Sequence, residues 1–134
     1  MVVLLVEDDT ALRTLAALQL VKERFHVLQA CNSADALRVA RSHSRIDLLL
    51  TDVEMGEGFN GIELASRLLE ERHNLPVVVM SGLPESKDAA ARKGFRFLPK
   101  PFTSNRLRQV VGETLASRIP VQSAKATGRP QSKE

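Results

Sequence analysis

The chain has 134 residues, of which 43% are hydrophobic and 26% are charged; this is typical of one globular domain and excludes a coiled coil or a fully disordered chain. The net charge is +3, but the last fifteen residues contribute +2 of it, through Lys125, Arg129 and Lys133 against Glu134. Because the rest is nearly neutral and contains no Trp or Tyr, we expect no binding to nucleic acid. The longest apolar run, residues 1–6, is too short for a membrane span and follows no basic segment, so we expect a cytoplasmic protein that does not enter a membrane.

Five short apolar segments predict the strands of a parallel sheet. They are residues 2–6, 25–30, 46–51, 77–80 and 95–98. The first, third and fourth are mainly apolar and are followed by polar residues, which is the pattern of strands buried on both faces. The other two segments carry the same signal more weakly.

Apolar residues at helical spacing lie between these strands. The first helical pattern places Leu12, Leu15 and Leu18, together with Ala16, on its apolar stripe. The following patterns have Ala36, Leu37 and Ala40 on the second stripe, and Ile62, Leu64, Ala65, Leu68 and Leu69 on the third. Strand and helix therefore alternate along the chain.

The last helical pattern is the clearest, and a polar segment follows it. Its stripe consists of Leu107, Val110, Val111, Thr114, Leu115 and Ile119. Thr103 suits the N-cap position, and Pro120 is expected to end the helix. The residues after it offer almost nothing to bury. We therefore expect a folded domain over residues 1–119 and a disordered basic tail over residues 120–134.

This alternation predicts an α/β fold in which a doubly wound parallel sheet has helices on both faces. Such sheets bind ligands beyond the carboxyl ends of their strands. Polar side chains follow four of the predicted strands there: Glu7 and Asp8 after the first, Asp52 after the third, Ser81 after the fourth and Lys100 after the fifth. We expect them to converge at one edge of the sheet.

The chemistry of these side chains suits phosphoryl transfer. Two carboxylates about 4 Å apart repel each other by roughly 4 kcal/mol at an effective dielectric constant of 20, so Glu7, Asp8 and Asp52 together call for a cation or a raised pKa. Mg²⁺ prefers oxygen ligands and binds through one or two carboxylates plus a phosphate. Lys100 supplies positive charge and Ser81 a hydroxyl donor for phosphoryl oxygens. Asp52 is then the candidate nucleophile.

Four signatures resemble the receiver domain of two-component response regulators. Residues 3–9 (VLLVEDD) are similar to its acidic first-strand motif, residues 50–55 (LTDVEM) to its phosphorylation loop, and residues 97–102 (FLPKPF) to its Lys-Pro-Phe motif. Ser81 stands where that family has Ser or Thr. The resemblance covers residues 1–119 and implies the flavodoxin-like (CheY-like) fold, with five strands in the order 2-1-3-4-5.

The resemblance implies a role for each residue of the acidic site. Asp52 would be the phosphoacceptor, attacking the phosphohistidine of a partner to form an acyl phosphate. Asp8, Asp52 and the backbone carbonyl of Glu54 would bind Mg²⁺, and Glu7 would assist through water. Lys100 would pair with the phosphoryl group.

The resemblance also implies a conformational switch. Ser81 would form a hydrogen bond to the phosphoryl group and move inward, and the aromatic Phe97 on the last strand would follow it. Because Phe97 lacks the hydroxyl of the more common Tyr, this switch would work by packing alone. The Lys100–Pro101 peptide bond is expected to be cis.

The sequence departs from the family pattern in two further places. Gly56 stands where Pro is usual, and the stretch from Asp52 to Gly61 is one residue longer than the common spacing, a variant associated with receivers of hybrid sensor kinases. The stretch from Ser81 to Lys100 is shorter than usual, with residues 89–91 as its only good helical core. We therefore expect a short or incomplete fourth helix.

The leading hypothesis is a single-domain response regulator, a monomer or weak homodimer. It would take a phosphoryl group onto Asp52 from a histidine kinase or a histidine phosphotransfer protein and signal by altered binding to other proteins, catalysing only its own phosphorylation and dephosphorylation. One alternative is a small Mg²⁺-dependent phosphohydrolase acting through an aspartyl phosphate, although residues 7–9 lack the Asp-x-Asp pattern of such enzymes. Another is a docking module of the same fold that is never phosphorylated.

Overall fold

Five strands and five helices alternate along the chain. The computed structural model describes the backbone of residues 1–123 and the side chains of residues 1–117. The strands are β1 (Val2–Val6), β2 (His26–Ala30), β3 (Leu48–Asp52), β4 (Val77–Ser81) and β5 (Arg96–Pro99). The helices are α1 (Thr10–Lys22), α2 (Ser33–Arg41), α3 (Gly61–Glu71), α4 (Pro84–Arg92) and α5 (Ser104–Ser123). Each strand lies within two residues of the position that its apolar segment predicted.

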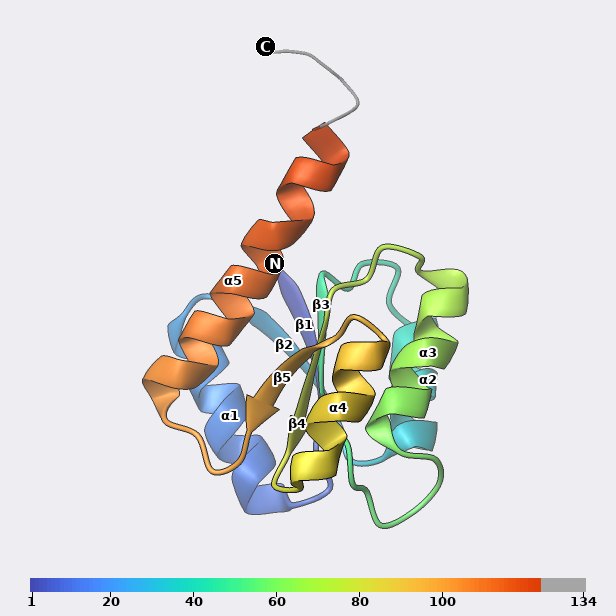
Figure 1. The fold of residues 1–134 in the computed structure, drawn as a ribbon, viewed down its shortest axis with the longest axis vertical. Coiled ribbons are helices and arrows are strands. Elements are labelled where there is room, and N and C mark those ends of the chain that lie inside the picture. Colours follow the sequence, from blue (N-terminus) through green and yellow to red (C-terminus); the bar gives the residue numbers. More distant parts are fainter. Residues whose placement is uncertain (124–134) are drawn as a thin grey trace.

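The strands form one parallel sheet in the order β2-β1-β3-β4-β5, which confirms the expected fold. The register aligns Leu4 of β1 with Leu28 of β2 and Leu49 of β3. The chain moves from β1 outward to β2, then returns past β1 to β3, so successive right-handed crossovers place helices on opposite faces. Figure 1 shows α1 and α5 on one face of the sheet and α2 and α3 on the other.

Each face of the sheet has its own apolar layer, and β1 contributes to both. Val3 and Leu5 pack toward α1 and α5, whereas Leu4 and Val6 pack toward α2, α3 and α4. All four side chains are completely buried. Fully burying a side chain of this size contributes roughly 1.5–3 kcal/mol. The central strands are thus held from both sides, and their carboxyl ends are placed rigidly.

The predicted apolar stripe of the first helix is wrong for its three leucines, whereas its fourth member, Ala16, is buried as expected. Leu12, Leu15 and Leu18 are 46%, 64% and 57% exposed, and α1 instead faces the sheet with the buried residues Ala16, Ala17 and Leu20. The three leucines and the buried residues both have helical spacing, but the two sets are centred on different sides of the helix. The small side chains of the two alanines let α1 approach the sheet closely, which leaves the larger leucines on the outer surface.

The last helix begins as predicted and ends later. Thr103 Oγ1 accepts the backbone N–H of Arg106 at 3.0 Å, as expected of an N-cap. The buried side chains of α5 are Leu107, Val110, Val111, Thr114 and Leu115. The helix then continues through Pro120 to Ser123, which corrects the expectation that Pro120 ends it. Proline removes one backbone donor, but the hydrogen bonds of the neighbouring turns remain. The rest of the expected tail, residues 124–134, lies outside the described residues.

The fourth helix is short but formed. It spans nine residues, with Pro84 in its first turn, where a missing N–H costs no helical hydrogen bond. Ala90 is completely buried in the layer shared with α2 and α3. Over residues 1–123, no helix is both long and apolar enough to cross a membrane.

Candidate functional site

The carboxyl ends of four strands bring the predicted polar side chains together. Glu7 and Asp8 directly follow β1, and Lys100 directly follows β5. Asp52 and Ser81 are the last residues of β3 and β4. Since β1, β3, β4 and β5 are successive neighbours in the sheet, all five residues lie along one edge of it. This edge includes the switch point, which is the place between β1 and β3 where the order of the strands reverses.

Three carboxylates form the centre of the site. Glu7, Asp8 and Asp52 each offer one oxygen atom, and these atoms all lie within 4.8 Å of one another. Glu7 and Asp52 are 2% and 4% exposed, and Asp8 reaches solvent. The buried Asp52 Oδ1 has Lys100 Nζ as an ion-pair partner at 3.0 Å. A cluster of three carboxylate oxygens with no Cys or His, two of them on buried residues, fits Mg²⁺.

Lys100 partly neutralises this cluster. Its Nζ lies 2.7 Å from Glu7 Oε1 and 3.0 Å from Asp52 Oδ1. Burial alone would lower the pKa of Lys100, but the hydrogen bonds and charges of Glu7 and Asp52 outweigh it and raise this pKa. Lys100 is therefore a permanent ammonium. One ammonium against three carboxylates leaves a charge of −2 when all are ionised, which a divalent cation would balance.

Asp52 is the most strongly perturbed acid of the site. Burial raises the pKa of Asp52 to about 7, since Lys100 opposes the effect only in part and the charge of Glu7 adds to it. Without a bound cation, Asp52 therefore titrates near neutral pH. Its protonation thus depends on what else occupies the site.

The loop after β3 orients Asp8. The backbone N–H of Gly56 donates to Asp8 Oδ2 at 3.1 Å, a bond that the usual Pro of the resembled family would lack. Burial is the largest single influence on the pKa of Asp8 and raises it, but the hydrogen bond from Gly56, further hydrogen bonds and the charge of Lys100 together lower this pKa overall. The ionised form of Asp8, which is the form that binds a cation, is therefore favoured.

The first residue of α3 packs directly on the main chain of Asp52. A Cβ at Gly61 would overlap the carbonyl oxygen of Asp52 and crowd Thr51 Oγ1. The Gly61 N–H donates to the carbonyl of Val53 at 2.9 Å. Only glycine allows this approach, so Gly61 fixes both the start of α3 and the return of the longer loop.

Ser81 has an unexpected partner. Its Oγ donates to the side-chain carboxylate of Glu54, whereas the sequence pointed only to the backbone carbonyl of Glu54. Ser86, on α4, donates to the same carboxylate. Sequence reasoning missed Ser86, because a serine in a polar nine-residue helix carries no signal of its own.

The second predicted switch residue, Phe97, is half-buried on β5. It is in register with Val79 of β4 and packs against the apolar layer beneath α4. This placement is compatible with motion linked to Ser81, which ends the neighbouring strand. The Lys100–Pro101 bond is cis, as expected.

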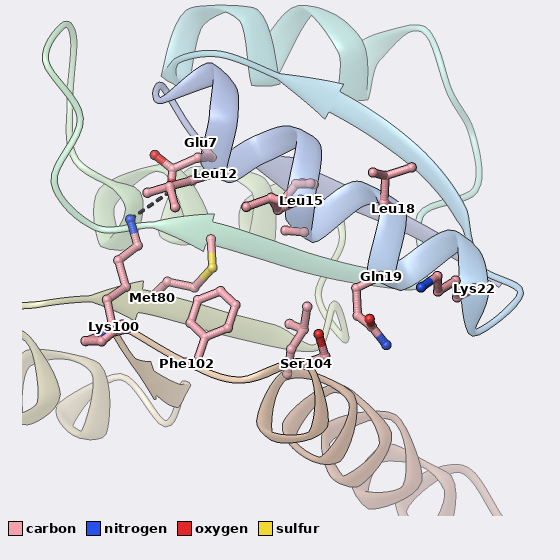
Figure 2. A pocket seen from close by; sticks show the side chains of 14 residues that line it. Glu7, Leu12, Leu15, Leu18, Gln19, Lys22, Met80, Lys100, Phe102 and Ser104 are labelled. Atoms are coloured by element: carbon pink, nitrogen blue, oxygen red, sulfur yellow. Dashed lines mark hydrogen bonds and ion pairs between the residues drawn. The ribbon is translucent and has the colours of Figure 1, made fainter.

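An apolar groove of about 670 Å³ adjoins the acidic site, between α1 and the start of α5. Figure 2 shows Leu12, Leu15 and Leu18 along one wall and Phe102 opposite them, with the ion pair of Lys100 and Glu7 at one end. The leucines that α1 leaves exposed therefore lead directly to the edge of the sheet where Asp52 lies.

The chain is similar to known proteins. Residues 3–112 match the response regulator receiver domain family. The DNA-binding transcriptional regulator NtrC of Bradyrhizobium sp. (strain RP501 Parasponia) is 36% identical over 117 residues, which are 85% of this chain and 24% of that protein. The autoinducer 1 sensor kinase/phosphatase LuxN of Vibrio campbellii (strain ATCC BAA-1116) is 33% identical over 115 residues, 84% of this chain and 13% of that protein.

The solved receiver domain from the hybrid histidine kinase CckA is 32% identical, with a TM-score of 0.72, covering 86% of this chain and 99% of that one. The chain spans about a quarter of the length of the first curated regulators it matches. The similarity thus includes transcriptional regulators and sensor kinases alike, and it falls on the receiver portion they share. With its fold, acidic site and family match in agreement, the chain belongs to the response regulator receiver domain family and has the role of a phosphoacceptor.

Proposed function

We propose that Asp52 accepts a phosphoryl group from the phosphohistidine of a histidine kinase or a histidine phosphotransfer protein. The observation that carries this proposal is the burial of Asp52 between Lys100 and two further carboxylates at the switch point of the sheet. Burying an acid costs free energy whatever its use, and a strongly perturbed acid among charged partners is typical of a reactive site. The same arrangement would not be needed by a module that only docks.

The residues divide the reaction among them. One oxygen of Asp52 attacks phosphorus, the bond between phosphorus and the histidine nitrogen breaks, and its electron pair stays on the imidazole. The product is an acyl phosphate on Asp52. Lys100 stabilises the charge on the phosphoryl oxygens, and Ser81 donates a hydrogen bond to one of them.

Asp8, Asp52 and the backbone carbonyl of Glu54 would hold Mg²⁺, with Glu7 assisting through water. When bound, the cation neutralises the carboxylates and the phosphoryl oxygens. Asp8 is kept ionised by Gly56, and Glu7 is tied to Lys100 and to the backbone N–H of Asp9 at 3.1 Å. These contacts hold the ligands in place while Asp52 reacts.

The groove between α1 and α5 is the proposed docking face for the phosphohistidine partner. That partner must bring its imidazole to Asp52, and Lys100 borders both the groove and Asp52. Exposed leucines at positions 12, 15 and 18 suit the apolar face of a helix. We propose a partner helix laid along α1.

Labelling with acetyl phosphate tests the phosphoacceptor chemistry. The mass of the intact protein is measured after incubation with and without Mg²⁺, for the wild type, Asp52→Asn and the control Asp88→Asn, which changes an exposed acid on α4. We expect one added phosphoryl group that requires both Mg²⁺ and Asp52. Equal labelling of Asp52→Asn would refute the assignment.

The phosphohydrolase alternative is not favoured by the receiver relatives. We propose that the chain catalyses only its own phosphorylation and dephosphorylation. Incubation with p-nitrophenyl phosphate and Mg²⁺ distinguishes a receiver from a phosphohydrolase, because sustained release of nitrophenol would indicate an enzyme acting on free phosphate esters. We expect none above the rate of Asp52→Asn.

A further inference from the structure

The hydroxyl of Ser81 is fully engaged at the end of β4. Its Oγ lies 2.8 Å from each carboxylate oxygen of Glu54, to which it donates, and it accepts the backbone N–H of Leu83 at 2.9 Å. A hydroxyl has a single proton to donate. While the Ser81 hydroxyl donates this proton to Glu54, it cannot donate a hydrogen bond to an acceptor at Asp52.

A second hydroxyl holds Glu54 in this position. Ser86 Oγ donates to Glu54 Oε2 at 2.8 Å. Ser81 and Ser86 are 1% and 6% exposed, whereas Glu54 itself reaches solvent. The carboxylate is therefore drawn from the β3–α3 loop onto two buried hydroxyls, one at the end of β4 and one in the first turn of α4.

Charge makes this arrangement sensitive to the state of Asp52. Among the described residues, no Lys, Arg or His forms an ion pair with Glu54. The charge of Glu54 acts on Asp52 and contributes, after burial and Glu7, to its raised pKa. A phosphoryl group carries a charge of about −1.5 to −2 at neutral pH, so on Asp52 it would both repel Glu54 and compete with it for the Ser81 proton.

We propose that Glu54 is a latch that keeps the Ser81 hydroxyl away from Asp52 in the unphosphorylated protein, and that Ser86 is the positioning residue of this latch. This inference rests on the proposed role of Asp52 as phosphoacceptor. Phosphorylation must exchange the Ser81–Glu54 hydrogen bond for one between Ser81 and the phosphoryl group. Because Ser86 belongs to α4, the exchange also changes what holds the first turn of that helix.

The latch opposes phosphorylation, so weakening it should increase affinity for a phosphoryl analogue. Beryllofluoride, which binds a carboxylate without being hydrolysed, is titrated with Mg²⁺ into each variant and followed by calorimetry. We expect Glu54→Ala to bind it about 5- to 10-fold more tightly than the wild type, as loss of a charge-assisted hydrogen bond at a partly exposed site predicts. Ser86→Ala should tighten binding by about 2- to 5-fold, and Ser86→Thr, which keeps the hydroxyl, should restore the wild-type affinity.

Two controls distinguish the latch from general effects. Glu85→Ala removes a neighbouring exposed acid that lines the same pocket beside α4 as Glu54 and Ser86 but forms no hydrogen bond to Ser81 among the described contacts. The affinity of this variant should stay within about 2-fold of the wild type. In a Ser81→Ala background, the gain from Glu54→Ala should fall to the smaller part that comes from removing the charge of Glu54, because the proton for which Glu54 competes is gone. By NMR, the Leu83 amide should shift when beryllofluoride binds the wild type, since it donates to Ser81 Oγ.

The outcomes separate the latch from the function on which it rests. If the wild type does not bind beryllofluoride, or Asp52→Asn binds it equally well, the phosphoacceptor assignment fails. If the wild type binds and Asp52→Asn does not, but folded Glu54→Ala and Glu54→Gln bind like the wild type, the latch is refuted and the function stands. An equal gain from Glu85→Ala, or a gain from Glu54→Ala that is undiminished without the Ser81 hydroxyl, also refutes it.

Discussion

Replacing Asp52 by Asn should stabilise the protein when no divalent cation is present. Asp52 is 4% exposed, and burial raises its pKa to about 7 against the ordinary value of 3.8. Between these two pH values the folded state binds more protons at this position than the unfolded state does. Stability from this group is therefore present in acid and is lost as the pH rises from about 4 through 7.

The magnitude follows from the two pKa values. A difference of roughly 3 pKa units corresponds to a limit of about 4 kcal/mol above pH 7. Asn also loses the attraction of Lys100, although that ammonium keeps Glu7 at 2.7 Å. Allowing for relaxation around the buried charge, we expect Asp52→Asn to be about 2 kcal/mol more stable at pH 8 and less than about 1 kcal/mol more stable at pH 5.

Urea unfolding in EDTA at the two pH values measures this difference. Circular dichroism is the appropriate probe, since the chain contains no Trp or Tyr. Asp88→Asn, an exposed change on α4, should leave the free energy of unfolding within about 0.5 kcal/mol of the wild type. If Asp52→Asn is less stable than the wild type at pH 8, the ion pair with Lys100 outweighs the burial of Asp52, and the reasoning is wrong.

Three further predictions concern the cation, the main chain and the groove. Mg²⁺ at a concentration 100 times its dissociation constant should stabilise the wild type by about 2.7 kcal/mol, which a higher melting temperature would reveal. Asp8→Asn should lose most of this stabilisation, and equal gains in both proteins would exclude Asp8 as a ligand. Gly61→Ala should cost about 2 kcal/mol in urea unfolding and slow labelling by acetyl phosphate, because its Cβ would overlap the Asp52 carbonyl; an unchanged midpoint would contradict that packing. Leu15→Ser should slow phosphoryl transfer from a phosphorylated histidine kinase far more than it slows labelling by acetyl phosphate. The control Val21→Ser changes a residue that is 56% exposed on α1 but does not line the groove, and it should not slow the transfer. Equal effects of the two changes would place the docking face elsewhere.

The strands and the acidic site were predictable from the sequence for a local reason. A strand buried on both faces must be an almost continuous apolar run, as in residues 77–80, so the run itself indicates where the strand lies. A polar residue immediately after such a run, like Asp52, lies at the carboxyl end of its strand. The strand order came from the resemblance to receiver domains, and the structure confirms it.

Helix faces and helix ends were less predictable, because they depend on what lies opposite. Leu12, Leu15 and Leu18 have the spacing of a core stripe, yet α1 buries Ala16 and Ala17 instead. Either face satisfies the helical period, and only the sheet against which α1 packs decides which face is buried. Pro120 likewise predicts the end of a helix, although α5 continues past this residue.

The sequence by itself determined which residues form the strands and which polar side chains gather at their carboxyl ends, since apolar runs and the residues after them are local properties of the chain. Only the tertiary structure decided how these side chains pair. The hydrogen bonds of Ser81 and Ser86 to Glu54 join residues 27 and 32 positions apart, and that of Gly56 to Asp8 joins residues 48 positions apart. No pattern of neighbouring residues encodes such contacts, because they exist only when the folded sheet brings separate loops to one edge.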